Sequence, residues 1–253
     1  MTPRIAAAAL LGAALALPLA GPALAGKRDN SLRFAANQVP ENIDSYFNNV
    51  RIGVILAHHV WDNLIFRDPK TNEYKPALAT AWRWVDAKTL ELDLRQGVKF
   101  HDGEAFDADD VVYTLNFVSK PENKVVTQAN VNWIAGAEKV SQYKVRVMTK
   151  APFPAALEYL AGPVPIYPNE YYAKVGPKGM NEKPVGTGPY KVVEHQPGKL
   201  IRMEANPDHF QGSPRVKATI AKIELRLIPD QNTQMAELIA GGLDWIFNVP
   251  PDQ

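Results

Sequence analysis

The chain has 253 residues, of which 28 are Lys or Arg, 27 are Asp or Glu and none is Cys. A formal net charge of +1 gives no electrostatic basis for nucleic-acid binding, so we expect no nucleic-acid partner. The absence of cysteine excludes a disulfide scaffold, a thiol nucleophile and thiolate metal sites.

Residues 1–25 have the pattern of a secretory signal peptide. A charged start at 1–4 is followed by an apolar run at 5–19 and by small residues at 23–25, which suit a cleavage site. We expect cleavage after Ala25 and a periplasmic protein. A membrane anchor is the competing interpretation, but the run is short for a span, and no Cys follows it that could carry a lipid.

The rest of the chain is predicted to alternate between strands and helices. Apolar residues alternate with polar ones, or recur with a helical period, in each predicted element of the first half: a strand at 32–36, a helix at 53–64, a hairpin over 82–94 with Trp82 and Trp84 in its buried face, and a helix at 108–118. A polar loop at 37–44 separates the first two elements. Asp107 is placed to cap the helix at 108–118, and Asp109 and Asp110 fall in the first turn of that helix.

The second half shows the same alternation. The predicted elements in chain order are a hairpin over 140–148, short helices at 152–160 and 169–174, a strand pair at 190–194 and 199–204, a strand at 220–228, a helix at 230–240 and a strand at 243–247. This mixture of strands and helices indicates an α/β or α+β protein.

Two clusters of side chains are candidates for chemistry. His58 and His59, with Asp62 close by, form a candidate metal site, but neighbouring residues on a helix point about 100° apart and cannot easily hold one ion, so we expect no metal. The acidic run at 102–110 lacks the spacing of a calcium loop, and helix capping accounts for its later members. A pair of catalytic carboxylates within this run is the open alternative, because such pairs converge in space rather than in sequence.

The segment 183–190 resembles a phosphate loop only superficially. It lacks the Gly-Lys-Ser/Thr ending that holds a nucleotide, so Gly186 and Gly188 are interpreted as a tight turn into the next strand. No Gly-x-Ser-x-Gly elbow is present in the sequence. We therefore predict no catalytic residue and no cofactor.

The segment 94–115, LRQGVKFHDGEAFDADDVVYTL, resembles the signature of the extracellular solute-binding proteins that serve peptide and nickel ABC transporters (family 5, dipeptide/oligopeptide-binding type). Further stretches agree with that family in order and spacing: WDNLI at 61–65, PALATAW at 76–82, PVGTGPY at 184–190, NP at 206–207 with Gly212, PD at 229–230 and GLD at 242–244. Together they cover nearly all of the chain that follows the signal peptide.

The resemblance implies an α/β fold of the periplasmic-binding-protein type (type II). It implies a first lobe built from residues 26–59 and 186–253 and an inserted subdomain at 60–185. Family members are longer because a second lobe follows, so the sequence looks like an N-terminal portion with the second lobe missing. We expect such a portion to have one wall of the ligand cleft, to bind peptide weakly or not at all, and to expose an unpaired strand edge.

The resemblance also implies a function. It implies the monomeric, non-enzymatic substrate-binding component of an ABC importer, which takes di- or oligopeptides or a similar solute to permease subunits in the inner membrane. Nickel chelates, opines and sugars are further solutes that similar proteins bind. An exported hydrolase that uses the carboxylates of 102–110, and a non-binding remnant of a solute-binding protein, are the alternatives.

Three residues are predicted to face the ligand. Asn37 and Gln38 follow the first strand, which is the usual place for cleft contacts in open α/β sheets, and their amides suit a peptide backbone. Trp133 could provide an apolar wall. The competing interpretations are a loop that caps itself, for Asn37 and Gln38, and the core of the subdomain, for Trp133.

Overall fold

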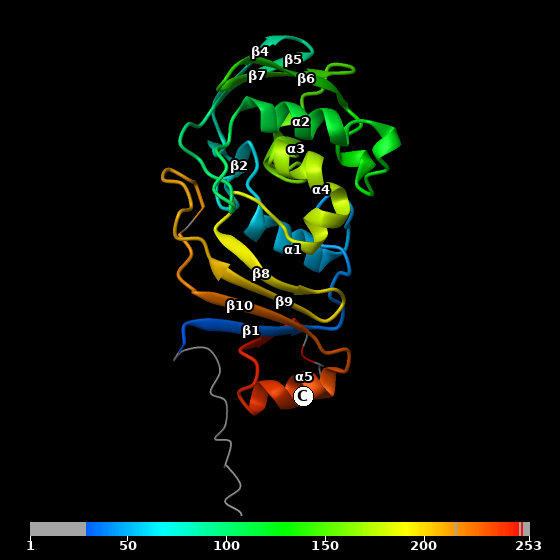
Figure 1. Ribbon diagram of the computed structural model, residues 1–253, viewed down its shortest axis with the longest axis vertical. Coiled ribbons are helices and arrows are strands. Elements are labelled where there is room, and N and C mark those ends of the chain that lie inside the picture. Colours follow the sequence, from blue (N-terminus) through cyan, green and yellow to red (C-terminus); the bar gives the residue numbers. More distant parts are fainter. Residues whose placement is uncertain (1–28, 216, 248, 250–253) are drawn as a thin grey trace, which may run out of the picture.

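Two β-sheets at opposite ends of an elongated molecule form the framework of the computed structural model (Figure 1). The structure describes residues 29–215, 217–247 and 249. The predicted signal peptide and its cleavage after Ala25 lie outside these residues. Within the described ranges, no helix combines the length and the apolar character that a membrane span requires.

The lower sheet in Figure 1 has five strands in the order β11-β1-β10-β9-β8. Its strands are β1 (Ser31–Ala36), β8 (Tyr190–Gln196), β9 (Leu200–Ala205), β10 (Lys222–Leu227) and β11 (Trp245–Ile246). β1 lies between β11 and β10 and is parallel to both, while β9 and β8 continue the sheet with antiparallel pairing. The carboxyl ends of β1, β10 and β11 therefore meet at one edge of the sheet.

Helices cover both faces of this sheet. α1 (Arg51–Val60) lies above it, and α5 (Gln231–Ile239) lies below it near β11 (Figure 1). Successive side chains of β1 point to opposite faces of the sheet, so both faces carry apolar residues that a helix can cover. Phe34 belongs to the main core, while its neighbour Ala35 packs with Leu243 and Ile246 on the opposite side.

The upper sheet has four antiparallel strands in the order β4-β5-β7-β6. They are β4 (Ala79–Asp86), β5 (Thr89–Leu94), β6 (Ile134–Ser141) and β7 (Lys144–Thr149). α2 (Ala108–Val118) packs against β6 and β7 and buries the apolar residues of the inner face, Leu90, Leu92, Val145 and Val147. Opposite charges alternate across the outer face, where Glu91 pairs with Arg83 at 2.5 Å and with Arg146 at 3.0 Å. The hydrogen bond from Arg83 is the main reason that the pKa of Glu91 is lowered to about 2, and Arg146 adds to it.

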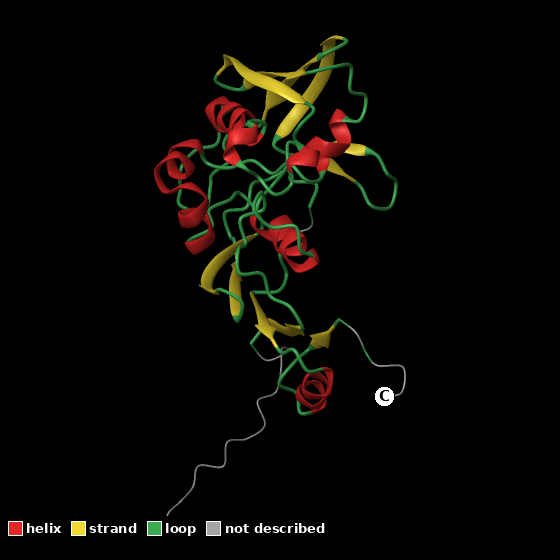
Figure 2. Cartoon of the chain, turned by 90° about the vertical axis from the view of Figure 1, so that its right-hand side faces the viewer, coloured by secondary structure: helices red, strands yellow, loops and turns green. Residues whose placement is uncertain are grey.

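The remaining elements lie between the two sheets or on the surface around them (Figure 2). They are β2 (Ile65–Arg67), β3 (Tyr74–Pro76), the 3₁₀ turns η1 (Pro121–Asn123) and η2 (Gln128–Asn130), α3 (Ala156–Ala161) and α4 (Asn169–Glu182). α4 is kinked at Gly176, which has a φ of 62° and is followed by Pro177.

Most predicted elements are confirmed. α2 has the predicted bounds, but the helix predicted at 53–64 begins at Arg51 and ends at Val60, and the helix predicted at 169–174 continues past its kink to Glu182. The assignment of 26–59 and 186–253 to one lobe and of 60–185 to an inserted subdomain stays a prediction.

The prediction that Trp84 is buried is wrong. Its side chain is 38% exposed, whereas Trp82 is partly buried against the core. The reason is the position of β4, which is an edge strand, while α2 covers the β6 and β7 side of the sheet. Trp84, toward the far end of β4, is consequently only partly covered.

Candidate functional site

Polar groups gather at the edge where the three parallel strands end. Asn37 and Gln38 follow β1 directly, are both exposed, and have no hydrogen-bond partner for their amides among the described residues. α1 begins beside them, because its first residues Arg51 and Ile52 line one cavity together with Asn37 and Gln38. Val50 precedes the helix without a side-chain cap, and no acid lies in its first turn. This edge therefore offers free side-chain amides together with the positive end of a helix dipole.

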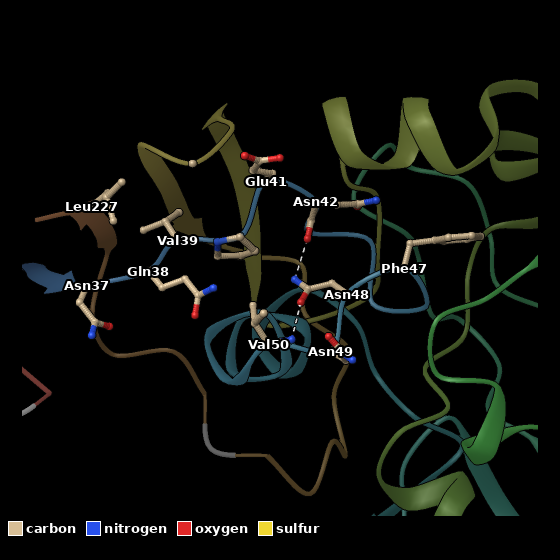
Figure 3. Close-up of a pocket in the computed structure, with 12 residues that line it drawn as sticks. Asn37, Gln38, Val39, Glu41, Asn42, Phe47, Asn48, Asn49, Val50 and Leu227 are labelled. Carbon is tan, nitrogen blue, oxygen red and sulfur yellow. Dashed lines mark hydrogen bonds between the residues drawn. The ribbon is translucent and has the colours of Figure 1, made fainter. Parts of the chain in front are cut away.

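Two cavities border the loop that carries these amides. The larger has a volume of about 440 Å³ and lies between the loop at 37–42, the segment 47–50, Gly198 and Leu227 (Figure 3). The smaller, of about 190 Å³, is lined by Asn37 and Gln38 together with Ala36, Arg51, Ile52 and Phe247. In Figure 3 the side chains of Asn37 and Gln38 point to one side of the loop and Glu41 points to the other.

Asn48 holds the far wall of the larger cavity in shape. Its Nδ2 donates to the carbonyl of Asn42 at 2.6 Å, and its Oδ1 accepts from the backbone N–H of Val50 at 2.8 Å (Figure 3). A Cβ at Gly53 would lie 1.9 Å from that Nδ2, so any larger residue there would push the Asn48 amide out of these hydrogen bonds. The start of α1 and the polar loop are thereby fixed to each other.

A buried carboxylate fixes the same loop to α4. Asp44 is fully buried and accepts hydrogen bonds from the backbone N–H of Tyr46 and from the hydroxyls of Tyr167 and Tyr172 at 2.9 and 3.0 Å. Burial raises the pKa of Asp44 to about 6, although all three hydrogen bonds favour the charged form. The loop is thus anchored from beneath, and its exposed amides remain free.

Trp133 is not brought together with Asn37 and Gln38. It is 7% exposed, its indole N–H donates to the carbonyl of Asn130 at 2.8 Å, and its ring stacks on Phe153 with centroids 5.0 Å apart. It lines neither of the two cavities that border the polar loop. Its contact with a ligand stays a prediction, and little of its surface is free to make one.

The structure also does not bring the residues of the candidate metal site together. Asp62 is buried and faces Thr187, His209 and Arg215, while His59 uses Nδ1 to bond the carbonyl of Ile55 within its own helix. In the described part of the chain, no three His, Cys, Asp or Glu side chains are grouped so that they could hold a metal ion.

The acidic run at 102–110 serves the start of α2, as its capping interpretation predicts. The Asp107 carboxylate accepts from the N–H of Asp109 at 2.7 Å, and Asp110 accepts from the N–H groups of Asp107 and Asn169. Burial raises the pKa of Asp110 to about 7. Asp109 pairs with Lys139 on the surface. Asp107 and Asp110 are therefore engaged in holding the start of α2.

We expect Asp107→Ala to lower the free energy of unfolding by about 1 kcal/mol, because a first-turn N–H loses its cap. Asp109→Ala is the matched control, since it removes an exposed ion pair and a first-turn charge but no cap, and should cost less than about 0.5 kcal/mol. Urea unfolding of the two variants measures both values. Equal losses in the two variants would contradict a capping role.

Gly186 and Gly188 bring a second segment against the end of α1. The N–H of Gly188 donates to the carbonyl of Val60 at 2.9 Å, and the Trp61 indole donates to the carbonyl of Val185 at 2.8 Å. A Cβ at Gly186 would lie 2.0 Å from the Val60 carbonyl oxygen, which leaves no room for any other residue. The glycines predicted to form a turn are thus required by close packing on α1.

Comparisons with known proteins agree with this architecture. The family model described as bacterial extracellular solute-binding proteins, family 5 middle, matches residues 73–253. The oligopeptide-binding protein AppA of Bacillus subtilis is 30% identical over 226 residues, which are 83% of this chain and 39% of that protein. The glutathione-binding protein GsiB of Salmonella typhimurium is 30% identical over 234 residues, 92% of this chain and 44% of that protein.

Solved structures show the same fold. AppA from Bacillus subtilis in complex with a nonapeptide has a TM-score of 0.78 and 26% identity, with 88% of this chain and 44% of that chain covered. The binding protein AgaA of A. tumefaciens in complex with agropinic acid has a TM-score of 0.76 and 26% identity, covering 85% of this chain and 43% of that chain. These likenesses confirm the predicted α/β lobe. The chain spans about two-fifths of the length of these relatives.

Proposed function

This chain belongs to the bacterial extracellular solute-binding proteins of family 5, and we propose that it contributes a wall of the site in which such a protein holds a peptide or a similar small solute for an ABC importer. The main support is the pair of free amides at the carboxyl ends of three parallel strands, bordered by two cavities. A peptide main chain carries alternating donors and acceptors, and the amides of Asn37 and Gln38 each provide both.

The location and partners proposed for the protein follow from the same family. A signal-peptide pattern at 1–25 supports export to the periplasm, and permease subunits in the inner membrane are the proposed partners of a monomeric binding protein. We propose no catalytic step. The hydrolase alternative depends on the carboxylates of 102–110, and capping of α2 by Asp107 and Asp110 accounts for two of them.

Peptide binding to the purified protein tests the proposal. By isothermal calorimetry with a set of di- to nonapeptides, on this chain joined to the second lobe that the family resemblance implies, we expect Asn37→Ala and Gln38→Ala each to weaken binding about fivefold to tenfold, because one net hydrogen bond is worth about 1 kcal/mol. Gln142→Ala is the matched control, since Gln142 is an exposed amide at the turn between β6 and β7.

Two results would count against this assignment. Affinities that stay unchanged in both loop variants would remove Asn37 and Gln38 from the site. Turnover of a peptide or glycoside by the protein, lost in an Asp107→Ala and Asp110→Asn double variant, would favour the hydrolase alternative instead.

A further inference from the structure

A third cavity lies along α1, next to the proposed solute site. It has a volume of about 250 Å³. Its lining includes Val54, Ala57 and His58 of α1 and, from loops further along the chain, Thr127, Asn130 and Gly162. Asn48 lines both this cavity and the 440 Å³ cavity.

The lining of this α1 cavity is uncharged. None of its residues is Lys, Arg, Asp or Glu. Partial desolvation of the exposed His58 ring, followed by the nearby Arg215 and His59, lowers its pKa, so that ring is neutral at pH 7. Val54 and Ala57 provide an apolar wall, and Val54 is 48% exposed at the cavity. A charged group that entered would lose its hydration without gaining an ion pair.

The size of the cavity sets the size of an occupant. Pockets that hold a whole small ligand have volumes of about 300–1,000 Å³, so this cavity suits one side chain rather than a complete solute.

From these features we infer that the α1 cavity is a selectivity subsite that takes one uncharged side chain of the bound solute. This inference rests on the proposed function, because the solute's main chain is the part that lies against Asn37 and Gln38. The subsite favours side chains such as leucine or glutamine and excludes lysine and glutamate. Val54 at the lip determines which side chains enter.

Two small probes test the subsite without requiring that peptides bind. N-acetyl-leucine amide and N-acetyl-lysine amide are titrated onto the ¹⁵N-labelled protein, and the backbone amides of Ala57, Thr127, Asn130 and Gly162 are followed. We expect the leucine probe to shift these amides and the lysine probe to leave them unchanged. Val54→Trp fills the lip and should abolish the shifts, whereas Val126→Trp, at an exposed valine that does not line the cavity, should preserve them.

Calorimetry with Ala-Leu-Ala and Ala-Lys-Ala, on the chain joined to a second lobe, separates this inference from the proposed function. We expect the leucine peptide to bind at least about tenfold more tightly, and Val54→Trp to remove that preference. Probe shifts without peptide binding would support the subsite and contradict the proposed peptide ligand. Equal shifts by the two probes, or leucine shifts that persist in Val54→Trp, would overturn the subsite whether or not peptides bind.

Discussion

Replacing Asp62 by alanine is expected to lower the free energy of unfolding by about 3–5 kcal/mol, which is the loss typical of a broken buried ion pair. Asp62 is 1% exposed and receives hydrogen bonds from the Thr187 hydroxyl at 3.0 Å and from Nε2 of His209 at 3.4 Å, while Nε of Arg215 lies 3.3 Å away. Burial alone would raise the pKa of Asp62, but these partners together bring it below its ordinary value. The alanine variant leaves the Arg215 cation, whose side chain is largely buried, without its carboxylate.

Two further variants separate the ion pair from a general effect of substitution. Asp62→Asn keeps an acceptor for Thr187 but removes the charge. It should therefore lower the free energy of unfolding, but by less than Asp62→Ala does. Asp208→Ala removes an exposed carboxylate near His209 and should cost less than about 0.5 kcal/mol. Urea unfolding measures all three. A loss for Asp62→Ala within 1 kcal/mol of the Asp208→Ala value would show that Asp62 does not hold these segments together.

Asp62 also connects the core to the candidate site. Arg215 donates through Nη1 to the carbonyl of His58, at the end of the helix whose side chains line the α1 cavity. Thr187 belongs to the glycine segment that packs against Val60. We therefore expect Asp62→Ala to disturb the C-terminal half of α1 before it disturbs the upper sheet, as measured by hydrogen exchange.

The sequence predicts features whose causes are local. The capping box of α2 is one, because Asp107 binds the N–H of Asp109 and Asp110 binds the N–H of Asp107, both within three residues. The position of Asn37 and Gln38 is another, since a polar pair after a strand falls at the carboxyl edge of a parallel sheet whichever strands pair with it.

Features that depend on distant contacts are not predictable in this way. The exposure of Trp84 follows from β4 being an edge strand, which its own alternating pattern does not encode. The partners of Asp62 lie 125 and 147 residues away for Thr187 and His209. The alternation of apolar and polar residues gives the faces of each element, but not which elements meet.

The α1 cavity illustrates the same limit at the site itself. Val54 and His58 lie one turn apart on a helix that the sequence predicts, and their exposure could suggest a contact surface. The opposite wall, at Thr127 and Gly162, comes from loops at least 69 residues further along the chain, as 127 less 58 shows. A helical pattern contains no information on that wall, so the sequence alone predicts the amides of the polar loop and misses the adjoining subsite.

Acidification is expected to weaken the contact between His101 and the glycine segment. Nδ1 of His101 accepts from the N–H of Gly186 at 3.3 Å, and Nε2 lies 3.0 Å from the carbonyl of Gly188. Because a carbonyl can only accept and an N–H can only donate, the ring must be neutral with its proton on Nε2. Burial, and to a lesser degree Lys191, lower the pKa of His101 to about 4, against the opposing effects of the Gly188 carbonyl and nearby carboxylates.

The sign of the effect follows from linkage. Above pH 6.5 the ring is neutral in both states, but between pH 6.5 and 4 the unfolded chain binds a proton that the folded chain refuses, so stability falls as the pH falls. The limit is about 3 kcal/mol, from 2.5 pKa units at about 1.4 kcal/mol each. Asp44 acts in the opposite sense, because its pKa is raised to about 6 and the folded state gains stability when the carboxyl is protonated.

Difference measurements separate these opposing groups. His101→Gln retains a donor and an acceptor but does not titrate, so the stability of the wild type relative to this variant should fall by up to about 3 kcal/mol between pH 7.5 and 4. The stability of the wild type relative to Asp44→Asn should rise over the same interval. Urea unfolding at half-unit pH steps measures both differences. If the His101→Gln difference stays constant with pH, the His101 ring is not held neutral against Gly186, and folding does not lower the pKa of His101.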